Sequence, residues 1–199
     1  MSKFKFLLLN DSHVKIGILG GSFNPPHEGH VHISLETLKR FNLSHIFWLV
    51  TPCSPAKDPS SYDNITRRFQ QCIDIIRPYK NKMTILDIEK FFKNFYSANT
   101  IEVIKNIHPQ AEIYWIIGCD NILEIDKWYK WRSIFEKTNL VVCERSDMSI
   151  KIHNTKAAHN FNKKDICNAS QINENNRNSF FMLHIKKINI SSTKIRSML

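Results

Sequence analysis

The sequence has few cysteines and no pairing pattern among them. The cysteines are odd in number, and no two of them form a C-x-x-C motif: Cys53, Cys72, Cys119, Cys143 and Cys167. This pattern argues against a disulfide framework and against a zinc ribbon. Reduced thiols that lie mostly in the core are expected instead, and they are typical of cytosolic proteins. The sequence therefore predicts a cytoplasmic protein.

Long apolar runs are also missing. A membrane-spanning helix needs about 20 consecutive apolar residues, and no stretch of this chain approaches that length. The apolar part of the beginning, MSKFKFLLLN, runs only from Phe6 to Leu9, which is too short for the hydrophobic region of a signal peptide. We expect no membrane partner, and a short, loosely ordered leader over residues 1–14.

Acidic residues are outnumbered by basic ones. The chain has 28 Lys and Arg residues against 18 Asp and Glu residues, which gives a formal net charge of +10. A basic surface attracts nucleic acid, an anionic membrane or a phosphorylated small molecule. The basic residues are scattered, and neither aromatic platforms on a sheet nor a basic recognition helix stands out. We expect no nucleic-acid partner, and a nucleic-acid-binding module is kept only as the alternative from another class.

Apolar runs alternate with amphipathic stretches along most of the chain. Strands are predicted at 15–19, 45–52, 83–89, 111–118, 139–145 and 180–188, and helices at 31–42, 64–79, 97–109, 119–138 (interrupted) and 191–199. Runs such as YWII and FWLV suit a parallel sheet that is covered on both faces. The fold prediction is a single α/β domain over residues 15–199, a doubly wound, mainly parallel sheet. In such sheets the ligand binds beyond the carboxyl ends of the strands.

Two details of this prediction can be checked directly. The helix at 64–79 is expected to bury one apolar face, made of Ile65, Phe69, Cys72, Ile73 and Ile76. Residues 147–178 are polar, rich in Asn and Lys and weakly periodic. They are expected to form a long, mobile surface excursion before the last strand.

A glycine-containing turn with two histidines follows the first predicted strand. Residues 20–30 read GGSFNPPHEGH. Gly20 and Gly21 permit a tight turn that brings backbone N–H groups close to an anion, and the N-terminus of the next helix favours negative charge. His27 and His30 lie at this terminus, where a ring N–H can bind phosphate oxygens. The stretch predicts a phosphate site that uses neither a Walker A lysine nor G-x-G-x-x-G.

Two other interpretations of these histidines remain open from the spacing alone. His27 and His30 could simply cap the helix. His32 adds a third ring, which would suit a metal. However, rings two residues apart on a helix diverge, and no acidic or cysteine partner is near. The sequence therefore predicts no metal-ligating residues.

Two signatures at opposite ends of the chain carry a resemblance to a known superfamily. GGSFNPPHEGH resembles the G-G/S-S/T-F-D/N-P-x-H-x-G-H signature of the adenylyltransferase branch of the H-x-G-H nucleotidyltransferases. The stretch ISSTKIR, residues 190–196, resembles their second signature, I-S-S/T-T-x-I/L-R. The blocks WLVTPCSPAK, FYSANTI, IIGCDNILEIDKWYKW and VVCERS resemble the nicotinate-mononucleotide adenylyltransferase family, although Ser146 stands where that family usually has Pro. The resemblance spans nearly the whole chain and implies a Rossmann-like nucleotidyltransferase fold.

The resemblance implies a reaction between ATP and nicotinate mononucleotide that gives deamido-NAD and pyrophosphate in NAD biosynthesis. The mononucleotide phosphate would attack the α-phosphorus of ATP, and it needs no general base because it is already ionised at neutral pH. Catalysis is then expected from positioning and charge stabilisation. Mg²⁺ would arrive on the ATP phosphates, with few or no dedicated protein ligands.

The resemblance also implies roles for particular residues. The expected catalytic residues are His27, His30 and Arg196. The expected ATP site adds Gly20, Gly21, Ser22, Phe23, Ser191, Ser192 and Thr193 to these three. The expected mononucleotide site comprises Asn24, Lys57, Tyr96, Ser97, Asp120, Trp128 and Arg145, with Trp131 as the competitor of Trp128 for the pyridine ring.

Three matters stay open at this point. The nearest alternative function is another adenylyltransferase of the superfamily, above all phosphopantetheine adenylyltransferase. The choice between nicotinate and nicotinamide mononucleotide depends on a few hydrogen-bond donors, because a carboxylate and an amide are nearly isosteric. The family usually continues beyond the second signature through a further helical tail, so the oligomeric state is open between monomer and homodimer.

Overall fold

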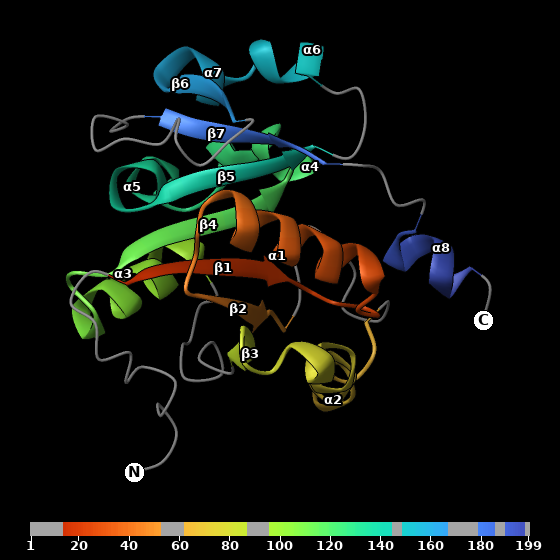
Figure 1. Ribbon diagram of the computed structural model, residues 1–199. Coiled ribbons are helices and arrows are strands. Elements are labelled where there is room, and N and C mark those ends of the chain that lie inside the picture. Colours follow the sequence, from red (N-terminus) through yellow and green to blue (C-terminus); the bar gives the residue numbers. More distant parts are fainter. Residues whose placement is uncertain are drawn as a thin grey trace.

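A seven-stranded parallel sheet forms the centre of the computed structural model, which describes residues 14–52, 62–86, 96–144, 149–166, 179–185 and 190–197. The strand order is β3-β2-β1-β4-β5-β7-β6, and each pair of neighbours runs parallel (Figure 1). The strands are β1 (Lys15–Gly21), β2 (His45–Val50), β3 (Met83–Leu86), β4 (Glu112–Gly118), β5 (Asn139–Glu144), β6 (Asn162–Ile166) and β7 (Ser179–His184). This confirms the predicted doubly wound parallel sheet.

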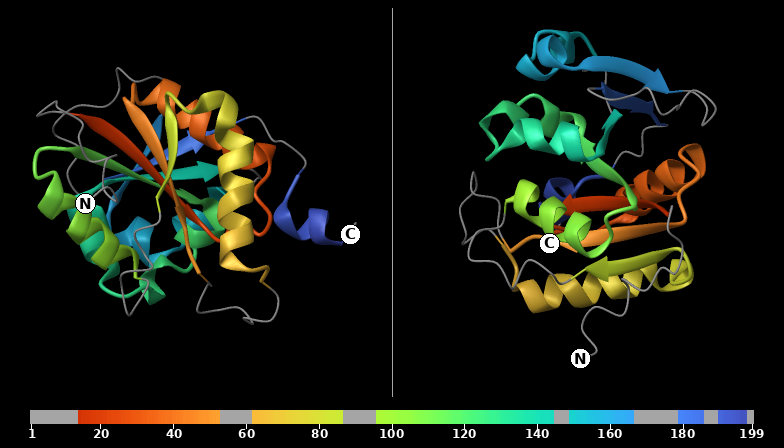
Figure 2. Two further views of the ribbon diagram at one scale, coloured as in Figure 1. Left: turned by 90° about the horizontal axis from the view of Figure 1, so that it is seen from below. Right: turned by 90° about the vertical axis from the view of Figure 1, so that its left-hand side faces the viewer.

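Helices cover both faces of the sheet (Figures 1 and 2). One face carries α1 (Glu28–Arg40) and α2 (Ile65–Ile76), and the other carries α3 (Ser97–Ile107), α4 (Cys119–Ile122) and α5 (Trp131–Lys137). The remaining helical elements are the 3-10 turns η3 (Arg77–Tyr79) and η5 (Ile125–Lys127) and the short helices α6 (Ser149–His153), α7 (Lys156–Asn160) and α8 (Ser192–Arg196). Within the described ranges, no helix has the length and apolar character that crossing a membrane requires.

The central strands bury side chains on both faces. Successive residues of a strand point to opposite sides, so Trp115 and Ile117 of β4 join one core cluster while Tyr114 and Ile116 join the other. Each of these side chains is at most 3% exposed. Burying a large apolar side chain contributes about 1.5–3 kcal/mol, which explains why β4 is apolar without alternation.

The segment between β5 and β7 departs from the predicted excursion. It contains α6, α7 and β6, and β6 pairs in parallel with β7 at the edge of the sheet. Ile152, Ala157 and Phe161 belong to the core. Elements of about five residues are too short to show a helical or strand period, so the Asn- and Lys-rich composition concealed them. The sheet therefore has seven strands, one more than predicted, and 167–178 lie outside the described residues.

The buried face of α2 is also rotated relative to the prediction. Ile65 and Ile73 are each 37% exposed, whereas Arg68, Cys72 and Ile76 are buried. Asn64 caps the helix by accepting from the N–H of Thr66 at 2.8 Å. Cys72 and Ile76 are therefore buried as predicted, whereas Arg68 is buried in place of Ile65 and Ile73. Of the expected leader, only Val14 falls within the described residues.

Candidate active site

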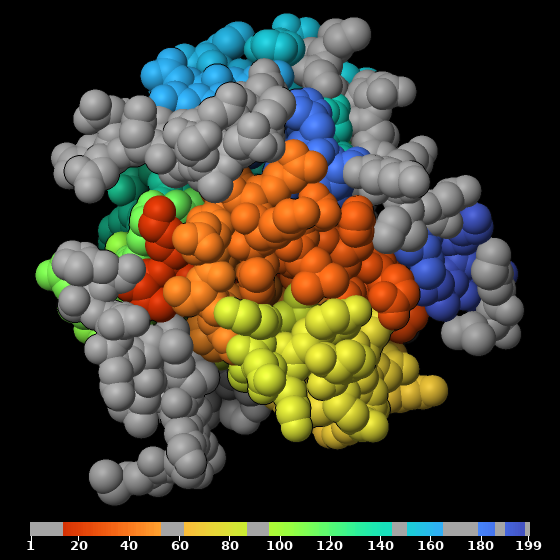
Figure 3. Space-filling view, in the orientation of Figure 1, coloured from red at the N-terminus to blue at the C-terminus, as the bar shows by residue number. Residues whose placement is uncertain are grey.

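The candidate site lies at the edge of the sheet where the parallel strands end. The loop 22–27 joins the end of β1 to the beginning of α1, and α8 lies against this junction (Figures 1 and 3). The two signatures at opposite ends of the sequence therefore meet in space. This position agrees with the rule that ligands bind beyond the carboxyl ends of parallel strands.

His27 and His30 form a capping box at the N-terminus of α1. The Nδ1 atom of His27 accepts from the N–H of Gly29 at 3.1 Å, and Nδ1 of His30 accepts from the N–H of His27 at 3.2 Å. The ring centroids are 3.9 Å apart. A neutral ring that accepts at Nδ1 carries its proton on Nε2. Both rings are thus set as Nε2–H donors, so capping the helix and binding a phosphate are compatible roles.

Gly29 leaves the space that the His27 ring fills. A Cβ atom on Gly29 would lie 2.9 Å from both Cε1 and Nδ1 of His27, and 3.4 Å from Cγ2 of Ile190. The first distance is shorter than van der Waals contact allows, so any side chain at this position would push the ring away. Steric exclusion by the His27 ring therefore explains why this position of the H-x-G-H motif is a glycine in this chain.

An aromatic cluster fixes the position of His30. Phe23 is only 1% exposed, stacks on Trp48 at 4.7 Å between ring centroids, and lies 4.9 Å from the His30 ring. The indole N–H of Trp48 donates to Ser34 at 2.8 Å, and the Ser34 hydroxyl donates to the carbonyl of His30 at 2.9 Å. The backbone of Phe23 has φ 46°, a left-handed conformation that costs about 1–2 kcal/mol in a non-glycine residue. The loop is held in one shape by this packing.

The helix α8 attaches to the same loop through its polar side chains. The Ser192 hydroxyl donates to the carbonyl of Pro25 at 2.8 Å, and the Arg196 guanidinium donates to the carbonyl of Asn24 and to the hydroxyl of Thr193. Ser191 is the N-cap, and its hydroxyl accepts from the N–H of Lys194 at 3.2 Å. The structure therefore brings Ser191, Ser192, Thr193 and Arg196 beside the loop 22–27, as the second signature implies.

Three of the predicted mononucleotide residues lie at or next to an exposed pair of stacked tyrosines: Tyr96, Ser97 and Trp128. Tyr96 and Ser97 begin α3, and the Tyr96 ring is 38% exposed and stacks on Tyr129 at 4.7 Å between centroids. Trp128, next to Tyr129, is half-buried against the core. Trp131 is only 8% exposed and packs against Phe135 and Phe161, so Trp128 is the ring that the structure leaves available.

The other predicted residues divide into described and undescribed ones. Asp120 is exposed in the first turn of α4, whose N-cap is Gly118. Asn24 is 5% exposed, and its side-chain carbonyl accepts from the N–H of Asp63 at 3.1 Å, so it also supports the start of α2. Lys57 and Arg145 lie outside the described residues. Within the described ranges no group of three or more His, Cys, Asp or Glu residues is placed to hold a metal ion.

The sequence patterns did not single out Arg68, whose guanidinium donates to the carbonyl of Ser22 in the loop 22–27. Arg68 is 1% exposed and lies one helical turn before Cys72. Burial raises the pKa of the Cys72 thiol to about 12, and the positive charge of Arg68 opposes that rise. The available signal was the i, i+4 spacing of Arg68, Cys72 and Ile76, which puts the arginine on the buried face.

Comparison with known proteins gives matches along nearly the whole chain. The model of the cytidylyltransferase-like family matches residues 18–198. A probable nicotinate-nucleotide adenylyltransferase of a Ruegeria strain is 37% identical over 76% of this chain and 78% of its own length. A probable nicotinate-nucleotide adenylyltransferase of Pelagibacter ubique is 35% identical over 94% of this chain and 95% of its own length.

Solved structures agree in fold. The nicotinic acid mononucleotide adenylyltransferase of Plasmodium falciparum, complexed with NaAD, superposes with a TM-score of 0.70 at 19% identity. The match covers 93% of this chain and 83% of the Plasmodium chain. At this identity the likeness shows the shared fold, a parallel sheet covered by helices on both faces.

Proposed function

The chain belongs to the cytidylyltransferase-like family and to the nicotinate-nucleotide adenylyltransferases, and we propose that it transfers the adenylyl group of ATP to nicotinate mononucleotide. The products are deamido-NAD and pyrophosphate. The observation that carries the proposal is that the His27–His30 capping box and α8 meet on one loop at the carboxyl edge of the sheet.

The ATP phosphates would bind between these two elements. The Nε2–H groups of His27 and His30 would donate to the phosphates, with His30 nearest the α-phosphate. The hydroxyls and backbone N–H groups of residues 191–193 would bind the β- and γ-phosphates, and Arg196 adds a positive charge that suits a phosphate oxygen. Gly20, Gly21, Ser22 and Phe23 would line the site mainly through their backbone.

The acceptor would bind beside the exposed aromatic group. Trp128 offers a flat face to a pyridine ring, and the N-terminus of α3 at Tyr96 and Ser97 offers backbone N–H groups to a carboxylate. Asp120 would accept hydrogen bonds from ribose hydroxyls. Lys57, Arg145 and Asn24 are proposed as further contacts of the mononucleotide.

The reaction exchanges one phosphorus–oxygen bond for another. An oxygen of the mononucleotide phosphate forms a bond to the α-phosphorus, the bond from that phosphorus to the bridging oxygen breaks, and pyrophosphate leaves with the bond electrons. The nucleophile is already an anion, so the protein's task is to align the groups and to stabilise negative charge.

The donors around the loop 22–27 suit phosphate rather than a metal ion, so Mg²⁺ would enter on ATP and neutralise phosphate charge. The thiols of Cys72, Cys119 and Cys143 are buried in the core, which supports a cytoplasmic location.

The acceptor can be identified by offering three candidates in parallel. Purified protein with Mg-ATP would receive nicotinate mononucleotide, nicotinamide mononucleotide or phosphopantetheine, and pyrophosphate release would be followed. We expect release with nicotinate mononucleotide to be at least about tenfold faster than with the other two, which is about 1.4 kcal/mol of discrimination. Release with phosphopantetheine alone would keep the phosphate site and overturn the proposed acceptor.

A further inference from the structure

The buried guanidinium of Arg68 contacts the loop 22–27, the proposed phosphate loop. Arg68, near the beginning of α2, is 1% exposed, although arginine is almost never fully buried unless its charge is satisfied. Its Nε donates to the carbonyl of Asp63 at 3.0 Å, one terminal nitrogen donates to Ser22 and, at 2.9 Å, to Thr51, and the other donates to Pro52 at 2.6 Å. One side chain thus joins the start of α2 to the segments that follow β1 and β2.

The bond to Ser22 fixes the direction of a neighbouring N–H group. In a trans peptide group the carbonyl and the N–H point in opposite directions. Because the Ser22 carbonyl faces Arg68, the N–H of the same peptide group, which belongs to Phe23, faces away from Arg68. Phe23 is also the residue with φ 46°. A hydrogen bond from a charged donor is stronger than one between neutral groups, so the contact with Arg68 stabilises the loop in this conformation.

The same guanidinium links the phosphate loop to the segment after β2. The N–H of Thr51 donates to the carbonyl of Gly21 at 2.9 Å, so the two segments are joined directly as well as through Arg68. Arg68 and the Thr51–Gly21 hydrogen bond therefore connect the backbone of residues 21–23 to α2 and to the end of β2. The aromatic cluster around Phe23 connects the same backbone to α1.

We propose that Arg68 is a positioning residue for the phosphate site: it holds the Ser22–Phe23 peptide group so that the Phe23 N–H faces the phosphates of ATP. Arg68 acts through the backbone and does not touch ATP itself. The inference rests on the proposed function for the identity of the nucleotide, and it is independent of which acceptor the protein uses.

The test compares Arg68→Lys with Arg67→Lys in equilibrium binding of Mg-ATP without an acceptor. Arg67 is the matched control because it is adjacent on α2, its side chain is 71% exposed, and it pairs only at the surface with Asp63 at 3.3 Å. Lysine keeps the charge but cannot reproduce the planar fork of donors. We expect Arg68→Lys to bind Mg-ATP about tenfold more weakly, a loss of about 1.4 kcal/mol, and Arg67→Lys to stay within about twofold.

Chemical rescue separates positioning from a general loss of stability. Guanidinium ion added to Arg68→Ala should partly restore Mg-ATP binding, whereas it should not restore His30→Ala. Guanidinium weakens folding, so a merely structural defect would become worse under the same treatment. The proposal is overturned if Arg68→Lys binds Mg-ATP within about twofold of the wild type, or if guanidinium fails to restore Arg68→Ala.

A measurement on the wild-type protein covers the case in which these variants do not fold. In protein labelled with ¹⁵N-phenylalanine, saturating Mg-ATP should shift the amide resonance of Phe23, and an unmoved Phe23 amide would overturn the proposal. Failure of the proposed function can be distinguished from failure of this proposal. If only the proposed function is wrong, the effects of Arg68 on Mg-ATP binding remain, but adding nicotinate mononucleotide causes no pyrophosphate release.

Discussion

The two halves of the candidate site differ in how firmly their side chains are held. On the proposed phosphate side, Phe23 and His27 are at most 4% exposed, and each is fixed by packing or hydrogen bonds. On the acceptor side, Tyr96 and Tyr129 are 38% and 45% exposed and are held mainly by stacking on each other. We infer that ATP phosphates meet a preorganised site, whereas the acceptor side becomes ordered when its ligand binds.

This difference predicts two kinds of kinetic effect. Preorganised donors act on the transition state, so their loss lowers kcat. Contacts that hold a substrate equally in the ground state and the transition state change KM alone. Substitutions that remove or displace the two histidine donors should therefore reduce turnover, and substitutions on the acceptor side should weaken the mononucleotide selectively.

The largest effect is expected from His30→Ala. Removing the Nε2–H donor nearest the α-phosphate should lower kcat by about 100-fold or more. His32→Ala, two residues along the same helix, is the control, because that ring is not part of the capping box. Steady-state pyrophosphate release measures both variants. Turnover of His30→Ala within a few-fold of the wild type would show that the phosphate role is wrong.

Gly29→Ala tests whether the position of the His27 ring matters apart from its chemistry. The added Cβ would lie 2.9 Å from the ring, and a misplacement of this kind can lower kcat by about ten- to 100-fold. Alanine is favoured over glycine in a helix by about 1 kcal/mol, so activity should fall more steeply than thermal stability. An unchanged kcat would mean that the exact position of the His27 ring does not matter for turnover.

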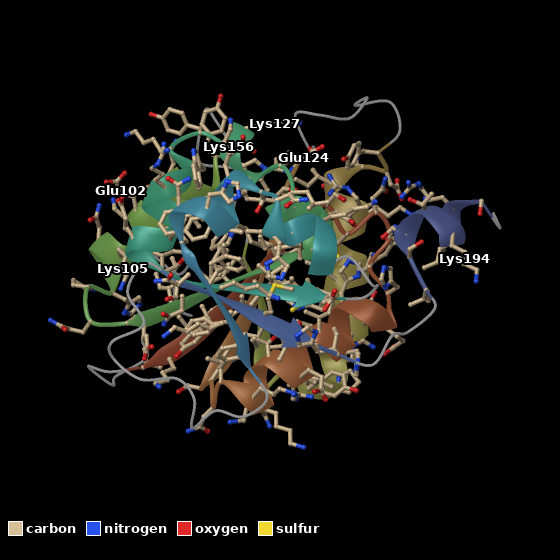
Figure 4. All side chains as sticks on the ribbon, turned by 90° about the horizontal axis from the view of Figure 1, so that it is seen from above. Glu102, Lys105, Glu124, Lys127, Lys156 and Lys194 are labelled. Carbon is tan, nitrogen blue, oxygen red and sulfur yellow. The ribbon has the colours of Figure 1, made fainter. Side chains whose placement is uncertain are left out.

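Arg196→Met should weaken ATP without a comparable effect on the mononucleotide. Arg196 is proposed to bind a phosphate oxygen of ATP, and losing a charge-assisted bond of about 1.5–3 kcal/mol predicts a KM for ATP at least about tenfold higher. Lys194→Met is the matched control, because Lys194 lies on the same helix and points away from the body of the protein (Figure 4). If the two substitutions raise the KM for ATP equally, Arg196 contributes only through its positive charge and not through a specific contact.

Trp128→Ala probes the acceptor side and should have a smaller effect. Loss of a stacking ring worth about 0.5–1.5 kcal/mol predicts a KM for the mononucleotide about two- to tenfold higher, with the KM for ATP unchanged. Trp131→Ala provides the contrast, since that ring is in the core and its loss should lower the melting temperature. If Trp128→Ala weakens ATP and not the mononucleotide, the assignment of the ring is wrong.

The smallest effect lies away from both halves, at His45 on β2. Burial, followed by the nearby positive charge of Lys82, lowers the pKa of His45. The unfolded chain then binds a proton more readily than the folded chain, so this contribution to stability is present above about pH 6.5 and is lost as the pH falls below it. The melting temperature of His45→Gln should depend less on pH between 7 and 5.5 than that of the wild type. An identical pH dependence would contradict this.

The arrangement of β1, the loop 22–27 and α1 was predictable from sequence because its residues are close together in the chain and carry a signature. His27 and His30 lie three apart, and the strand, loop and helix around them follow from short-range patterns. The contact of α8 with Asn24 and Pro25 joins residues far apart in the chain, and the second signature was the only indication of it.

The missed features depend on tertiary packing. Arg68 resembles a surface residue in the sequence, and hydrogen bonds to four carbonyls from three separate segments help to make its burial favourable. Likewise β6 carries polar residues, and its place at the sheet edge follows from pairing with β7. The spacing of Arg68, Cys72 and Ile76 places the arginine on a buried face but does not show what satisfies its charge, and β6 is too short to show a period, so hydrophobic patterning did not predict either feature.

The central claim is that this protein joins ATP and nicotinate mononucleotide, and it can be tested in one reaction. Purified protein with Mg-ATP and nicotinate mononucleotide would be sampled over time, and deamido-NAD and pyrophosphate would be measured together. The account predicts equal amounts of the two products, and neither when the mononucleotide is omitted. Pyrophosphate without deamido-NAD, or no product with both substrates present, would contradict it.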